Sequence, residues 1–165
     1  MRASVLYLLF CCCVSMAWCK GVETGKPAPE LSATLIDGKT FDLAQQRGKV
    51  VVVHFWATWC GPCRVEMPIL DAFQRAHKSD GLVVVAISLD TQDDLDKVKA
   101  MMRDFSFPAA LIENTNAKGY GRIWRVPLTF VIDRDGVLRR DGFKAAPSID
   151  ATVLDHDVLP LLRAP

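Results

Sequence analysis

Continuous apolar runs and alternating stretches follow one another along the chain and predict an α/β order of elements. The runs from Lys49 to Trp56 and from Leu82 to Leu89 are rich in β-branched residues, which is typical of strands buried on both faces of a sheet. Leu31 to Leu43 instead alternates apolar and polar residues around Asp37-Gly38, a pattern that predicts a β-hairpin. Ala109 to Ile112 predicts one further short strand.

Helical periodicity appears between and after these strands. A helix is expected from Gly61 to about His77, a second helix after a cap at Thr91, and a final helix after a cap at Ser148. Residues 114–124 predict a short irregular helix. The apolar residues expected to face the core are Val65, Ile69, Leu70 and Phe73 in the first helix and Leu95, Val98, Met101 and Met102 in the second.

A second hairpin is predicted near the end of the chain. Leu128 to Ile132 has the composition of a strand, Asp133 to Gly136 that of a turn, and Val137 to Phe143 that of the partner strand. The order is therefore strand, helix, strand and helix, followed by a hairpin and a helix. This order predicts a mixed central sheet with helices on both faces.

The N-terminus has the pattern of a targeting segment. Arg2 precedes an apolar stretch from Ala3 to Trp18, which is shorter than the roughly 20 residues that a membrane span needs. We expect residues 1–19 to be a signal peptide, cleaved after Ala17 or, as a second choice, after Cys19. An uncleaved N-terminal anchor is the alternative.

The rest of the chain is expected to form a linker and one domain. Residues 20–30 are rich in glycine, proline and polar residues and predict a linker, so residues 31–165 are left for the domain. Half of the residues are hydrophobic and the formal net charge is +1, as in soluble globular proteins. No dense cluster of lysine and arginine is present, so we expect no nucleic-acid partner.

The cysteines separate into a group that leaves with the signal peptide and a pair that stays. Six are present, and the last two, Cys60 and Cys63, lie within the predicted domain. Two cysteines three positions apart do not form a disulfide-stapled scaffold, and in an exported protein such a pair is typical of redox turnover. Half of a zinc site is the alternative, for which only His54, His77 and His156 offer histidine ligands.

The position of the pair predicts its chemistry. Cys60 follows a buried strand and stands where a helix begins, and the free N–H groups and dipole of a helix N-terminus stabilise a thiolate. Gly61 and Pro62 set a tight start to the helix and hold the second sulfur close. We therefore expect Cys60 to attack disulfides and Cys63 to resolve the mixed disulfide.

Three segments together carry a family resemblance: FWATWCGPCRVEMP at 55–68, the strand and acidic residue around 86–90, and VPLTFVIDRDG at 126–136. They resemble the thioredoxin superfamily, and most closely its exported TlpA/ResA-like branch, over residues 25–162. The resemblance implies a thioredoxin-like fold and a thiol–disulfide oxidoreductase that reduces protein disulfides. It also implies that the cysteine pair acts without a separate cofactor.

The same resemblance implies partners and a location. The partners are protein thiols and disulfides, with an upstream membrane or periplasmic electron donor. The location is the periplasm, with or without an N-terminal membrane anchor. Cytochrome c maturation is the commonest role in this branch, and general rescue of oxidised periplasmic thiols is equally compatible with the sequence.

Roles for individual residues also follow from the resemblance. Pro127 matches the cis-proline that packs against the cysteine pair, and Val126 before it matches the residue whose backbone pairs with substrate. Arg125 stands where the family often has glycine, which alters the rim of the substrate groove. Trp59 is expected to shield the sulfurs, and Gly61 and Pro62 to contribute to substrate contact.

Two residues are candidates for moving the proton of Cys63. Asp90 stands after a buried strand, where the branch usually has glutamate, and capping of the next helix is its alternative role. His54 stands where thioredoxins have a buried aspartate, and a core histidine is its alternative role. Glu66 is expected on the solvated surface of the first helix, and Trp124 and Phe107 in the core.

Two rival functions remain open. A thiol peroxidase shares this fold, although its reactive cysteine follows a Pro-x-x-x-Thr-x-x-Cys pattern and Thr58 is two residues before Cys60. A metal-binding or chaperone-like module would use the fold without turnover.

Overall fold

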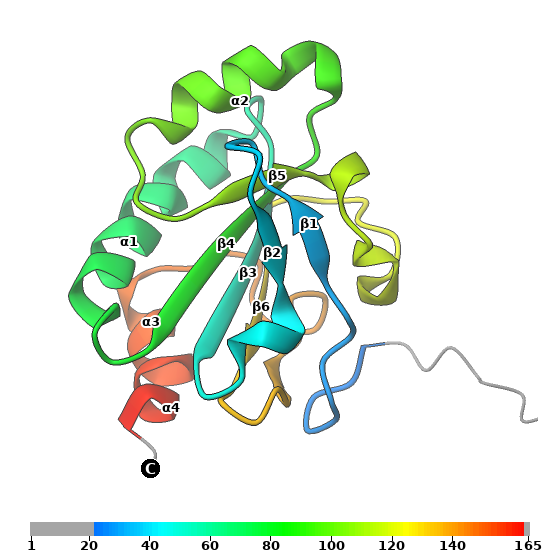
Figure 1. Ribbon diagram of the computed structural model, residues 1–165. Coiled ribbons are helices and arrows are strands. Elements are labelled where there is room, and N and C mark those ends of the chain that lie inside the picture. Colours follow the sequence, from blue (N-terminus) through cyan, green and yellow to red (C-terminus); the bar gives the residue numbers. More distant parts are fainter. Residues whose placement is uncertain (1–21, 164–165) are drawn as a thin grey trace, which may run out of the picture.

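A five-stranded sheet organises the protein, as a computed structural model that describes residues 22–163 shows (Figure 1). The strand order is β5-β4-β3-β6-β7, and a separate two-stranded sheet pairs β1 with β2. The strands are β1 (Ser32–Thr34), β2 (Thr40–Asp42), β3 (Val50–Trp56), β4 (Leu82–Ser88), β5 (Ala109–Leu111), β6 (Leu128–Ile132) and β7 (Leu138–Arg140). The helices are α1 (Gly61–His77), α2 (Leu95–Met102), α3 (Ala151–Asp157) and α4 (Leu159–Arg163), with 3-10 helices η1 (Leu43–Gln46), η2 (Gln92–Asp94), η3 (Ile112–Asn114) and η4 (Ala117–Tyr120).

The two β-branched runs form the centre of the sheet, as predicted. All seven residues of β3 are buried, and β3 pairs in parallel with β4 from Val50 opposite Leu82 to Trp56 opposite Ser88. On its other side β3 pairs with β6 in antiparallel orientation. Strands buried on both faces need apolar side chains in both directions, which explains the continuous runs. The thioredoxin-like mixed sheet is confirmed.

The two faces of the sheet are covered differently. Buried side chains of all four α-helices join one apolar cluster with alternate residues of β3, such as Val52 and Trp56. The opposite face is covered by the β1–β2 hairpin and by Ala117 and Tyr120 of η4. This 3-10 helix, η4, lies where an irregular helix over 114–124 was predicted, and it is shorter than that range. Gly121 follows it at a φ of 82°, a conformation that favours glycine and ends the turn.

Three details differ from the sequence predictions. Strand β7 is shorter than the predicted run from Val137 to Phe143. The final helical region begins after Asp150, whose side chain accepts a hydrogen bond from the Val153 N–H, and not at Ser148. Thr91 precedes η2 without a side-chain capping bond, because a 3-10 turn leads into α2.

The segment before the domain is partly attached to the sheet. The predicted signal peptide lies outside the described residues. In the predicted linker, Pro27 forms a β-bridge with Val137, and the Gly25 N–H donates to the Leu138 carbonyl. In the part of the chain from residue 22 to residue 163, no helix has both the length and the hydropathy to span a membrane.

Candidate active site

Cys60 and Cys63 form a disulfide at the junction of β3 and α1. Cys60 is the N-cap of α1, and its Sγ accepts a hydrogen bond from the Cys63 N–H at 3.2 Å. Cys60 is 4% exposed and Cys63 is fully buried. The sulfur at the helix start is therefore the more accessible of the two, as predicted, and the first free N–H groups of the helix lie beside it.

Helix α1 is long enough to supply a strong dipole at this point. It runs without a break for 17 residues, and Pro62 occupies its first turn, where no backbone N–H is needed. A free N–H group and the positive end of the dipole both favour a thiolate over a thiol. Once the disulfide is reduced, the Cys60 sulfur is the one placed to carry the negative charge.

The rim around Cys60 consists of exposed and half-buried groups. The Trp59 side chain is 68% exposed. The Val126–Pro127 peptide bond is cis, as the family resemblance implies. Arg125 donates to the carbonyl oxygens of Gly142 (3.0 Å) and Phe143 (3.1 Å), so it ties this rim to the loop after β7. Gly61 is half-buried and Pro62 is exposed beside them.

Asp90 is a buried carboxylate whose two oxygens are fully engaged. They accept hydrogen bonds from the Thr58 N–H (2.8 Å), the Thr58 hydroxyl (2.6 Å) and the Ser88 hydroxyl (2.5 Å). Thr58 lies in the short turn between β3 and Cys60, whereas Ser88 ends β4. Asp90 therefore links the turn that carries Cys60 to the neighbouring strand.

His54 lies in the core on the same face of β3 as the helices. Its Nδ1 is 2.9 Å from the Thr129 hydroxyl of β6, and its Nε2 is buried with no hydrogen-bond partner among the described residues. Burial lowers the pKa of His54 to about 4, because a charged imidazolium has no water to solvate it there. His54 is thus neutral at physiological pH.

Glu66, expected on the helix surface, is buried instead. It is 3% exposed, and neither carboxylate oxygen has a hydrogen-bond partner in the described structure. Burial raises the pKa of the Glu66 carboxyl to about 7, although the nearby Ile149 backbone and the positive charge of Arg140 act in the opposite direction. The Ile149 amide is thus close to the carboxyl without the geometry of a full hydrogen bond.

The rotation of α1 explains this error. The buried stripe of the helix is Cys63, Glu66, Met67, Leu70, Asp71 and Gln74. Val65, expected inside, is 69% exposed. Glu66 is three positions after Cys63, so the two side chains share one face of the helix. That spacing from the cysteine is the signal by which the sequence could have identified Glu66.

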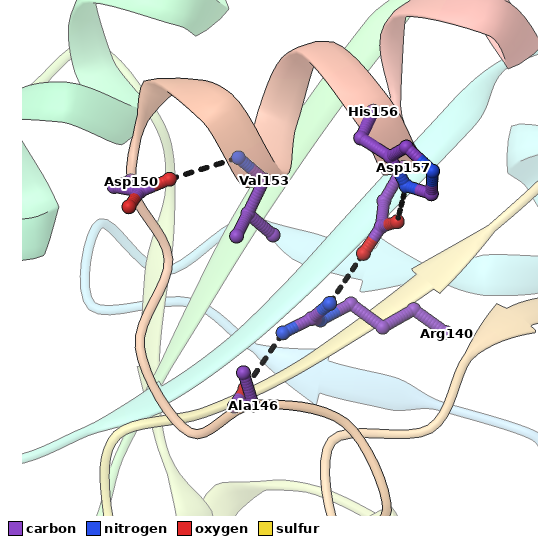
Figure 2. A network of polar contacts seen from close by, with 6 residues as sticks. All are labelled: Arg140, Ala146, Asp150, Val153, His156 and Asp157. Atoms are coloured by element: carbon purple, nitrogen blue, oxygen red, sulfur yellow. Dashed lines mark hydrogen bonds and ion pairs between the residues drawn. The ribbon is translucent and has the colours of Figure 1, made fainter.

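A polar network includes Arg140, whose positive charge acts on Glu66. The Arg140 guanidinium pairs with Asp157 of α3 and donates to the Ala146 carbonyl at 2.7 Å, as Figure 2 shows. The Asp150 carboxylate accepts from the Val153 N–H at 2.8 Å in the same region. These contacts hold the segment between β7 and α3, including Ile149, against the face where Glu66 is buried.

The remaining candidates divide between core and surface. Trp56 and Phe107 are buried, as expected for packing residues. Trp124, predicted in the core, is 70% exposed, and the Arg125 guanidinium lies 5.6 Å from the centre of its ring. From residue 22 to residue 163, no group of three or more histidine, cysteine, aspartate or glutamate side chains is arranged to hold a metal ion.

Comparison with known proteins agrees with this site. Residues 24–141 match the AhpC/TSA family. A thiol–disulfide oxidoreductase ResA of Bacillus cereus is 30% identical over 139 residues, which cover 80% of each chain. The thioredoxin-like protein YneN of Bacillus subtilis is 34% identical over 122 residues, covering 72% of this chain and 71% of that protein.

A solved structure is also similar to this chain. The thiol:disulfide interchange protein of the thioredoxin family from Chlorobium tepidum TLS superimposes with a TM-score of 0.70 at 32% sequence identity, over 83% of this chain and 96% of that one. The sheet, the cysteine pair at the start of α1 and these relatives lead to one conclusion. The chain belongs to the AhpC/TSA family of the thioredoxin superfamily, and it is a ResA-like thiol–disulfide oxidoreductase.

Proposed function

We propose that the protein reduces disulfide bonds in exported proteins, with Cys60 as the nucleophile and Cys63 as the resolving thiol. The observation that carries this proposal is the Cys60–Cys63 disulfide at the N-terminus of α1, with Cys60 the more accessible sulfur. A stabilised thiolate at that point is a good nucleophile and, later in the cycle, a good leaving group.

The proposed reaction has two exchange steps. The Cys60 thiolate attacks one sulfur of the partner's disulfide, and the other partner sulfur leaves as a thiolate and takes a proton. The Cys63 thiolate then attacks Cys60 Sγ, and the second partner sulfur leaves in the same way. The partner gains two electrons and two protons, and the enzyme is left with the Cys60–Cys63 disulfide that the structure contains. An upstream dithiol donor must reduce that disulfide for the next cycle.

The second step requires that Cys63 lose its proton inside the protein. Glu66 supports this step best, because it shares the face of α1 with Cys63, has unpaired oxygens and has a pKa of about 7. Asp90 and His54 are the carriers that the sequence proposes. The three hydrogen bonds of Asp90 and the low pKa of His54 instead support roles in positioning the Cys60 turn and in core packing.

The substrate side of the site is proposed to be the rim around Cys60. Trp59, Gly61 and Pro62 adjoin the cysteine pair in the sequence at the start of α1, and the family resemblance implies that Val126 and Pro127, just before β6, complete the rim. The backbone of Val126 is proposed to pair with an extended substrate segment. Support comes from its position just before the start of β6, outside the ladder with β3 that begins at Leu128.

The cellular setting is also a proposal. We infer a periplasmic protein from Arg2 and the apolar stretch after it, either cleaved or anchored at its N-terminus. Expressed in a Gram-negative host, the mature protein should appear in the periplasm shortened by about 17–19 residues. An intact N-terminus in the membrane fraction would replace cleavage with anchoring. Assembly of c-type cytochromes is the proposed pathway, and general thiol repair is its alternative.

One comparison of activities tests the proposed function against its rivals. Reduced enzyme should reduce the disulfides of insulin and show little turnover with hydrogen peroxide. Preference for peroxide would favour the thiol peroxidase. Stoichiometric metal in the purified protein, without disulfide reductase activity, would favour the metal-binding module. Identification of the proteins trapped by a Cys63→Ser variant would separate cytochrome assembly, which predicts apocytochromes, from general repair, which predicts a mixed set.

A further inference from the structure

A groove beside the cysteine pair holds most of the exposed large apolar surface of the protein. Within residues 22–163, the exposed large hydrophobic side chains are Trp59, Val65 and Trp124. Trp59 and Trp124 both line a groove of about 660 Å³. The other apolar lining residues are Leu89, Ile112, Ala117 and Ile123. Exposed tryptophans that gather around a concave surface mark a recognition site more often than a solvated one.

The groove also carries an excess of positive charge. From residue 112 to residue 127 the chain has three basic residues, Lys118, Arg122 and Arg125, and one acidic residue, Glu113. Lys118, Arg125 and the exposed Glu113 line the groove, and the exposed Arg122 lies at its edge, between the lining residues Gly121 and Ile123. The protein as a whole has a formal net charge of only +1, so this edge is more basic than the molecule.

Two features hold the basic and aromatic groups in place. The Arg125 guanidinium lies against the Trp124 ring at 5.6 Å and is fixed by the carbonyl oxygens of Gly142 and Phe143. The backbone of Trp59 is fixed by its neighbour Cys60, whose sulfur is bound at the start of α1. A segment lying in the groove would therefore contact Trp59, the residue next to the reactive cysteine.

From these observations we infer that the groove selects its substrates: it binds an extended polypeptide segment that carries an aromatic side chain and carboxylates close to its cysteine. The aromatic side chain packs between Trp59 and Trp124, and the carboxylates face Lys118 and Arg122. This inference rests on the proposed disulfide reductase function and names the substrate class for the same site. An extended segment fits better than a flat surface, because the groove is concave and is lined by Trp59, the residue next to Cys60.

Synthetic peptides with one internal disulfide test the inference. Three peptides share one sequence with a phenylalanine beside a cysteine and differ only in two flanking residues, which are glutamate, glutamine or lysine. With reduced wild-type enzyme at low salt, the glutamate peptide should react about 3- to 10-fold faster than the glutamine peptide, as two exposed ion pairs allow, and the lysine peptide more slowly. The differences among the three rates should shrink at about 0.5 M salt, because ions screen exposed charges at that concentration.

Variants then assign the effect to the groove. The double variant Lys118→Glu with Arg122→Glu should reverse the order of the three peptides. Lys49→Glu, an exposed lysine at the opposite end of β3 from Cys60, should keep the wild-type order. Trp124→Ala should remove most of the advantage of the phenylalanine peptide over a matched alanine peptide, an effect of about 5-fold or more for an aromatic contact at an interface.

Each other outcome overturns a defined part of the proposal. Equal rates for the three peptides would overturn the inference and leave the proposed function standing. Failure of every peptide to react would overturn both. Equal peptide rates, together with sedimentation on vesicles containing phosphatidylglycerol that Trp124→Ala and the double variant abolish, would assign the surface to a membrane instead.

Discussion

Two carboxylates near the cysteine pair, Asp90 and Glu66, are each 3% exposed but differ in how their oxygens are satisfied. Asp90 receives three hydrogen bonds from Thr58 and Ser88. Glu66 receives none with full geometry among the described residues, and its pKa rises to about 7. Both side chains are equally buried, so what distinguishes the two carboxylates is the number of hydrogen bonds that their oxygens accept.

The two carboxylates are expected to have different roles, one structural and one in proton transfer. A buried carboxylate surrounded by donors is a fixed part of the structure, and removing it leaves those donors unpaired. A buried carboxylate without hydrogen-bond donors has a poorly stabilised negative charge. Its pKa therefore rises, and it can exchange protons near neutral pH. We therefore expect Asp90 to position the turn that carries Cys60 and Glu66 to serve the proton balance of Cys63.

The largest effects should come from the two sulfurs of the cysteine pair. Cys60→Ser removes the nucleophile, so disulfide reduction should fall to the background rate and no partner should be trapped. Cys63→Ser keeps the nucleophile but cannot resolve the mixed disulfide, so covalent complexes should accumulate and dissolve in reductant. Non-reducing gels read both outcomes. Equal trapping by the two variants would reject the assigned roles and with them the link to Glu66.

Glu66→Gln should have the next largest effect. If Glu66 accepts the Cys63 proton, the variant should resolve mixed disulfides about 10²-fold more slowly at about pH 7.5, and the first attack should be unchanged. In the wild type, the resolution rate should rise with pH and level off above about pH 7, and this step should vanish in the variant. Stopped-flow tryptophan fluorescence over about pH 5–9 measures it, with the exposed Glu23→Gln as the control. An unchanged profile would remove Glu66 from proton transfer.

The stability of Glu66→Gln gives a second, independent measure. The folded protein keeps a proton on Glu66 up to about pH 7, whereas the unfolded chain loses it near pH 4.5. The folded state binds more protons at this site in that window, so the contribution of Glu66 to wild-type stability should fall as pH rises from about 4.5 to 7 and then level off. This pH-dependent loss of stability is on the order of 3 kcal/mol and should be absent from the variant. Urea unfolding at about pH 5 and pH 8 compares the two.

Asp90 variants sharpen the contrast between positioning and proton transfer. Asp90→Ala leaves the Thr58 N–H and two hydroxyls without their acceptor, so the free energy of unfolding should fall by about 1.5–3 kcal/mol. Asp90→Asn should lose less stability. The rate of disulfide exchange should fall in both variants, and the shape of its pH profile should not change. Thr58→Val, which removes one donor of the same cluster, should act in the same direction. A selective loss of resolution in Asp90→Asn, with stability intact, would establish Asp90 as the proton carrier instead.

The smallest effect on disulfide exchange is expected for His54. Because its folded pKa is about 4 and its unfolded value is near 6.5, only the unfolded chain binds the proton between these values. The contribution of His54 to wild-type stability should therefore decline as pH falls from about 6.5 to 4. His54→Asn should lose this contribution, which is read as the difference between wild type and variant, and should keep its exchange rate at neutral and alkaline pH. Urea unfolding at about pH 4.5 and 7.5 measures it, with the exposed His156→Asn as control. A slower exchange in His54→Asn at neutral pH would make His54 part of the mechanism.

Local features of the sequence determined most of the fold and the reactive pair. The β-branched runs of β3 and β4 need no context to be recognised as buried strands, because both faces of each strand must be apolar. Cys60 and Cys63 are three positions apart, and the strand before them and the helix after them adjoin the pair in the sequence. The disulfide and the more accessible cysteine were therefore predictable. Pro127 was predictable only by its family motif, since nothing local distinguishes a cis from a trans bond there.

Tertiary structure alone decided which polar groups near the pair are free. The three donors to Asp90 include two from Thr58, which is 32 residues away along the chain. The rotation of α1 turned Glu66 inward and Val65 outward, because the cysteine pair anchors the start of the helix. The buried stripe of the helix then includes Asp71 and Gln74. Their polar groups form hydrogen bonds with Ser106, Leu82 and Val84. Apolar periodicity cannot detect a stripe whose polar members are satisfied from distant segments. Glu66 found no such partner among the described residues, and that difference is a property of the packed molecule and not of the sequence around it.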